Sequence, residues 1–136
     1  MRIVMAHGDS PGSYTVELTT RQWQIIDGTM DNEVSVEAEN GDPRGVVHVG
    51  RQVRVAGWDQ VAHWTPGVPG SGSWPPDGQV VSVTMSSDQW ALVCSALIRW
   101  ADVSERLGKV EDATTSRAIH DLVVAQVSKR DTLKET

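Results

Sequence analysis

The chain has little of what several classes of protein need. It contains one cysteine, Cys94, and no phenylalanine, and no apolar run approaches the roughly 18 residues of a membrane span. A single cysteine excludes an internal disulfide and a cysteine-based zinc site. The apolar stretch at residues 1–6 is too short for a secretory signal. We therefore expect a cytoplasmic protein without a membrane segment.

Lysine is also scarce, with 3 residues against 9 arginines, a usage typical of genomes rich in G and C. The 18 acidic residues outnumber the 12 basic ones and give a net charge of −6. Because an acidic chain without a basic patch is repelled by phosphate backbones, direct nucleic-acid binding is not expected. The length of 136 residues and the hydrophobic content of 39% predict one globular domain with a substantial core.

An internal repeat organises the chain. A shift of 67 residues aligns residues 14–23 with 81–90, and this register holds without a gap as far as Gly41 and Gly108. Each copy opens with alternating apolar residues, which predict a short half-buried strand. After the strand, apolar residues recur at helical spacing until the glycine, the residue type that commonly ends a helix.

The start of each helix is marked in the same way. Thr19 and Ser86 are predicted N-cap residues, and Gln22 and Gln89 follow three places later, which is the spacing of a capping box. A second helix is expected after each glycine. In the first copy, Asp42 is the predicted cap of this helix and Pro43 its first residue.

The repeat predicts a mainly α fold with a small β ribbon. The unit is strand, helix, turn, helix, present twice, and the four helices are expected to pack about a pseudo-twofold axis. An α+β fold is the alternative, because valines alternate within residues 33–55 as they do in strands. The predicted single domain, 1–136, divides into an N-terminal arm (1–12), unit 1 (13–64), a Pro/Gly connector (65–78), unit 2 (79–130) and a tail (131–136).

No stretch has the pattern of a catalytic or metal site. The loop His7-Gly8-Asp9-Ser10 resembles the core of histidine phosphatases, but Ala6 stands where that core has arginine. The four histidines lack the spacing of metal ligands, and Cys94 has apolar neighbours typical of a buried, inert thiol. We expect no catalytic residue, no metal and no cofactor, and a protein that is not an enzyme.

The strongest charge anomaly is an acidic segment at residues 27–42. It holds six acidic residues and no lysine or arginine, whereas the equivalent window of unit 2, residues 94–109, has a net charge of +1. In that window Asp102 with Arg106 and Glu105 with Lys109 have the spacing of helical ion pairs. A solvated face is one interpretation of the acidic segment, and a docking surface for a basic protein is the other. The candidate docking residues are Asp27, Asp31, Glu33, Glu37, Glu39 and Asp42.

Arginine and tryptophan supply the remaining candidates. Arg51 and Arg54 fall on the second helix of unit 1, where Arg54 has the spacing to stack on Trp58. These three residues are the candidate ligand contacts if a pocket lies between the units. Trp64 and Trp74 border the connector and either anchor it to the helices, which we favour, or bind a partner from an exposed position.

The capped helical hairpins, the arginine usage and the size resemble small accessory proteins of high-GC actinobacteria and their phages. This resemblance implies a protein that acts by binding. The leading hypothesis is a non-enzymatic interaction module that docks a basic protein surface through residues 27–42. The alternative is a protein that binds a nucleotide-like small ligand between the units, and an enzyme comes third. A homodimer is left open.

Overall fold

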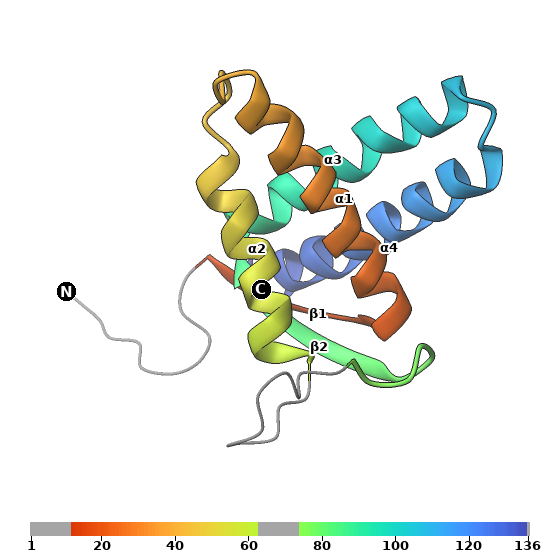
Figure 1. The fold of residues 1–136 in the computed structure, drawn as a ribbon. Coiled ribbons are helices and arrows are strands. Elements are labelled where there is room, and N and C mark those ends of the chain that lie inside the picture. Colours follow the sequence, from red (N-terminus) through yellow and green to blue (C-terminus); the bar gives the residue numbers. More distant parts are fainter. Residues whose placement is uncertain (1–11, 63–73, 136) are drawn as a thin grey trace, which may run out of the picture.

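The fold follows the predicted repeat. The computed structural model describes residues 12–62 and 74–135, with side chains as far as 129. Its elements, in chain order, are β1 (Ser13–Thr19), α1 (Thr20–Glu39), α2 (Val47–Gln60), β2 (Val80–Ser86), α3 (Ser87–Arg106) and α4 (Val110–Glu135). The protein is mainly α with a two-stranded ribbon, and Figure 1 shows the two helical hairpins above that ribbon. Adding 67 to the bounds of β1 and α1 gives the bounds of β2 and α3.

The ribbon contains the pseudo-twofold axis. β1 and β2 are antiparallel, and Val16 pairs with Val83, its own equivalent in the repeat. The neighbouring pairs are Thr15 with Thr84 and Glu17 with Ser82. The 67-residue shift converts each of these two pairs into the other. The two units therefore meet as the halves of a symmetric dimer would, within one chain.

Local signals act as predicted at both ends of the first helix in each unit. Thr19 and Ser86 each form a complete capping box with the glutamine three residues on. Gly41 and Gly108 have φ angles of 84° and 81°, which glycine adopts without strain. Around each glycine, two backbone bonds close the helix as a Schellman motif.

Two predicted boundaries and the alternative fold differ from the structure. Pro43 lies in a turn outside α2, although the Asp42 carboxylate does accept the Val46 and Val47 N–H groups and so caps α2 across that turn. The alternative with strands at residues 33–55 is wrong, because α1 and α2 cover most of that range. Residues 131–135 of the predicted tail continue α4, and the predicted N-terminal arm lies outside the described residues except for Gly12.

The core joins both units. Trp23 and Trp90, the equivalent tryptophans of the two helix starts, are both buried, and they belong to one apolar cluster with residues of every element. Within the described ranges no helix is long and apolar enough to cross a membrane.

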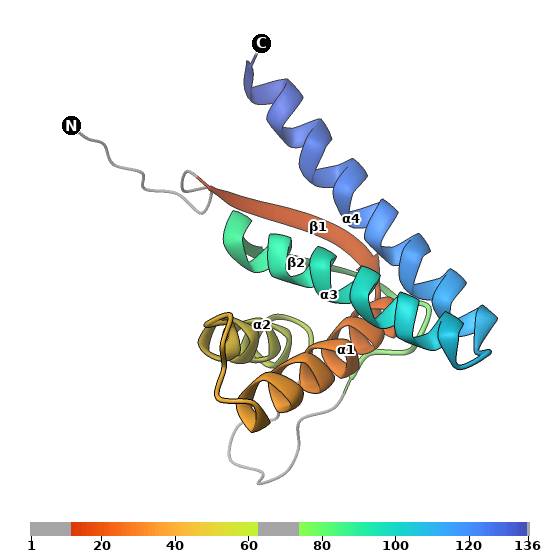
Figure 2. The same ribbon diagram turned by 90° about the horizontal axis from the view of Figure 1, so that it is seen from above.

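Each edge of the ribbon is closed by a glutamine of the other unit. The Gln126 side chain of α4 accepts the Glu17 N–H of β1 and donates to the Glu17 carbonyl, both at 2.8 Å. The Gln60 side chain of α2 bonds the backbone of Thr84 in β2 in the same way, at 2.7 and 2.8 Å. Figure 2 shows α4 running beside β1. Each unit's second helix thus packs on the strand of the other unit, and the two units interlock.

Candidate binding pocket

Four of the six carboxylates in the acidic segment form ion pairs with arginines of the same chain. Asp27 and Asp31, like-charged neighbours on α1, share one arginine, since Arg54 of α2 binds Asp27 Oδ1 at 3.1 Å and Asp31 Oδ1 at 2.9 Å. The hydrogen bond to Asp27 raises the pKa of Arg54. These two ion pairs hold α2 against α1.

Glu33 and Glu37 share a second arginine. Arg44, in the turn between α1 and α2, pairs with Glu33 and with Glu37, the latter at 3.1 Å, and these two bonds raise its pKa. Glu33 is 1% exposed and Glu37 is also buried. These two carboxylates therefore do not belong to a solvated face.

The last two members of the segment also have distinct positions. Asp42 caps α2, and Glu39 is exposed at the end of α1. Unit 2 uses the same bridging arrangement: Arg117 of α4 binds Asp102 at 2.7 Å and Glu105 at 2.8 Å. The helical partners predicted for these two acids, Arg106 and Lys109, are replaced by Arg117.

A pocket lies between the units where α1 faces α3. Glu33 bonds three of the other residues that line it: its carboxylate pairs with Arg99 at 3.3 Å, accepts the indole N–H of Trp100 at 2.9 Å, and binds Arg44. The cavity has a volume of about 170 Å³. The residues lining it are Glu33, Val36, Glu37, Arg44, Arg99, Trp100, Val103 and Arg106.

The charges of the pocket favour an anion. Two carboxylates face three guanidinium groups, which leaves a net charge of +1. Arg106 forms no ion pair with the described part of the chain. The ion pairs use Nη2 of Arg44 and Nε of Arg99, so other N–H groups of these side chains remain available for a ligand. Val36, Val103 and the Trp100 ring provide the apolar wall.

The predicted ligand contacts lie elsewhere. Arg51 is exposed on α2, and Trp58 packs against Trp74 with ring centroids 5.6 Å apart. Trp74 is half-buried and packs against the core, as the anchor interpretation expects. Trp64 lies outside the described residues. Arg51, Arg54 and Trp58 are therefore not part of the pocket between the units.

No metal centre is formed by the described residues, since none of them group three or more histidine, cysteine, aspartate or glutamate side chains at ligand distance. Cys94 is partly buried, and burial raises the pKa of its thiol.

Sequence reasoning missed Arg44, Arg99, Trp100 and Arg106 as site residues. The signal was present in the repeat: the acidic window of unit 1 and the basic window of unit 2 are equivalent by the 67-residue shift. A pseudo-twofold axis that pairs Val16 with Val83 brings equivalent helices together, so opposite charges in equivalent windows indicate a contact between the units.

Comparison with protein-family models, curated proteins and solved structures gives no match to this chain, so the pocket is interpreted from its own geometry.

Proposed function

We propose that the protein is a non-enzymatic binding module that takes a small organic acid in the pocket between its two units. The observation that supports this is a pocket lined by three guanidinium groups, of which that of Arg106 has no ion partner among the described residues. Glu33 holds two of the guanidinium groups in place before a ligand arrives, which lowers the entropic cost of binding.

The size of the cavity narrows the ligand class. Its 170 Å³ lies below the roughly 300–1,000 Å³ typical of pockets for drug-sized ligands, so a nucleotide exceeds it. A single carboxylate neutralises the net charge of +1, and an apolar or aromatic body can lie against Trp100, Val36 and Val103. A monocarboxylic acid such as benzoate has both features.

Docking of a basic protein through residues 27–42 is the weaker proposal. Asp27, Asp31, Glu33 and Glu37 already bind arginines of the same chain, and Asp42 caps α2. A basic partner would have to displace those arginines, whose charge-assisted bonds are worth about 1.5–3 kcal/mol each.

Calorimetric titration with benzoate tests the proposal. We expect a dissociation constant of about 1 mM, and Arg106→Ala should weaken binding about tenfold through loss of a charge-assisted bond. Arg51→Ala removes an equal charge outside the cavity and should leave the affinity unchanged. Equal effects of the two substitutions, or no binding to the unsubstituted protein, would contradict the proposal.

A further inference from the structure

The chain segment that precedes β2 covers the start of α1. Thr20 N donates to Gln79 O at 2.9 Å, and Arg21 N donates to Asp77 O at 3.0 Å. Earlier in the same segment, Pro75 is buried and Trp74 packs on Trp58 of α2. Residues 74–79 therefore contact both the start of α1 and α2, the second helix of unit 1.

The first of these bonds recurs in unit 2. Ser87 N, at the start of α3, donates to Gly12 O at 2.6 Å. Ser87 is the equivalent of Thr20, and Gly12 is the equivalent of Gln79, by the same 67-residue shift. The chain before β1 thus reaches α3 as the chain before β2 reaches α1.

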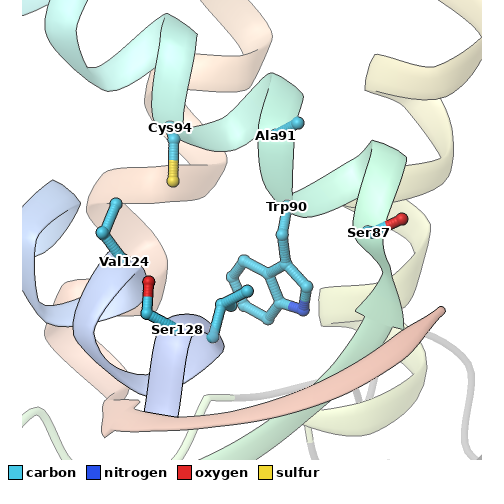
Figure 3. A pocket seen from close by; sticks show the side chains of 7 residues that line it. Ser87, Trp90, Ala91, Cys94, Val124 and Ser128 are labelled. Carbon is cyan, nitrogen blue, oxygen red and sulfur yellow. The ribbon is translucent and has the colours of Figure 1, made fainter. Parts of the chain in front are cut away.

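An apolar groove lies next to this point. It has a volume of about 160 Å³ between α3 and α4, and Ser87, the partner of Gly12, is one of its lining residues. Cys94 of α3 and Val124 of α4 face each other across it (Figure 3). The remaining lining residues are Trp90, Ala91, Val127 and Ser128.

The equivalent place in unit 1 is filled in a different way. The glutamine pairs that close the ribbon relate α2 to α4 by a shift of 66 residues, which makes Trp58 the equivalent of Val124. Trp23, the equivalent of Trp90, packs directly on the neighbouring Gly57. Trp58, next to Gly57, contacts Trp74 of the segment before β2. By the pseudo-twofold axis, the segment before β1 is the part of the chain expected to cover the groove in unit 2.

We propose that the apolar groove between α3 and α4 binds the chain's own N-terminal segment, residues 3–6. These residues, Ile-Val-Met-Ala, lie outside the described part of the chain and carry the apolar side chains that such a groove buries. Their reach is sufficient. The seven residues before Gly12, numbers 5–11, can span up to about 23 Å when extended. The helical segment from Ser87 to Cys94 is only about 10 Å long.

Cys94, the single cysteine of the 136-residue chain, reports on the groove. Its alkylation by N-ethylmaleimide is followed by mass spectrometry. We expect Val4→Asp to speed alkylation about tenfold, because a buried carboxylate disfavours the covered state. Ser10→Asp places the same charge outside the apolar run and should leave the rate unchanged.

A groove variant completes the test. Val124 is 40% exposed, so Val124→Asp should fold and speed alkylation as Val4→Asp does, and the double variant should add nothing further. Equal rates for Val4→Asp and the unsubstituted protein would overturn the proposal. An alkylation rate that falls as protein concentration rises would overturn it too, since a second copy would then cover the groove.

Discussion

Glu33 holds the two units together at a single buried carboxylate. One side chain of α1 accepts bonds from the turn after α1, through Arg44, and from α3, through Arg99 and Trp100. Its sequence neighbours suggested only a cluster of like charges. Its partners lie 11, 66 and 67 residues further along the chain, and periodicity within one helix carries no information about them.

Glu33→Gln should therefore lower the free energy of unfolding by about 2 kcal/mol, since an amide replaces a carboxylate that receives charge-assisted bonds. Urea denaturation measures the change. Glu39→Gln removes an equal charge from an exposed position of the same helix and should alter stability by less than about 0.5 kcal/mol. Similar losses for both variants would mean that Glu33 contributes only to net charge.

Two helical glycines should respond to alanine in opposite directions. A Cβ at Gly57 would lie 2.6 Å from Cε2 of the buried Trp23 indole, whereas a Cβ at Gly28 meets nothing within 4 Å. We expect Gly57→Ala to destabilise by about 1–3 kcal/mol through overpacking. Gly28→Ala should stabilise by about 0.5–1 kcal/mol through helix propensity. Thermal unfolding of the pair checks both signs, and a stabilising Gly57→Ala would contradict the contact.

At the scale of elements, each edge of the ribbon has one strand residue near its middle that is bonded by a helix side chain, Glu17 in β1 and Thr84 in β2. Gln60 and Gln126 each present a side-chain amide that bonds as a neighbouring strand would. Such closure protects a two-stranded ribbon from pairing with other chains. Neither glutamine was predicted for this role, because a glutamine on a helix face has no pattern that indicates a strand partner.

Gln126→Ala should expose the Glu17 backbone and cost about 1–2 kcal/mol, since two hydrogen bonds are lost. It should also promote self-association at the β1 edge, seen as a concentration-dependent increase in sedimentation coefficient. Gln24→Ala removes a glutamine of α1 outside these edge bonds and should leave the protein unchanged in both measurements. A Gln126→Ala protein with unaltered stability and sedimentation would refute edge closure.

The elements that could be predicted are those specified by local chemistry. Capping boxes, terminal glycines and strand alternation lie within a few residues of each other, and the repeat doubled each signal. Pro43 shows the limit: its φ suits a first helical residue, yet the turn that carries Arg44 to Glu33 and Glu37 delays α2 to Val47. The residues of the pocket are brought together by contacts between distant parts of the chain. In the sequence, only the opposite charges of the two equivalent windows indicated that contact.

For the whole molecule, the crossed packing makes the units interdependent. α2 closes the edge of β2 and α4 closes the edge of β1, so unfolding either unit exposes the strand of the other. We expect one cooperative transition in urea, with tryptophan fluorescence and far-UV circular dichroism coincident. Two separated transitions would show that the units fold independently.

The net charge of −6 also has a different meaning for the whole molecule. The acidic segment that supplies this charge forms ion pairs that fix α2 to α1 and α1 to α3. Within the described part of the chain, Arg106 is the pocket residue whose charge has no ion partner. Association with an anionic small molecule is therefore compatible with an acidic protein, because local geometry and not net charge sets the potential inside a pocket.

The most direct test of the binding pocket is a proton–nitrogen NMR titration with benzoate that follows the Trp100 indole N–H and the Nε–H signals of Arg44, Arg99 and Arg106. The account predicts saturable shifts of these signals, with the Arg51 Nε–H unmoved. Shifts spread evenly over exposed arginines, or none at the Trp100 indole, would contradict a site between the two units.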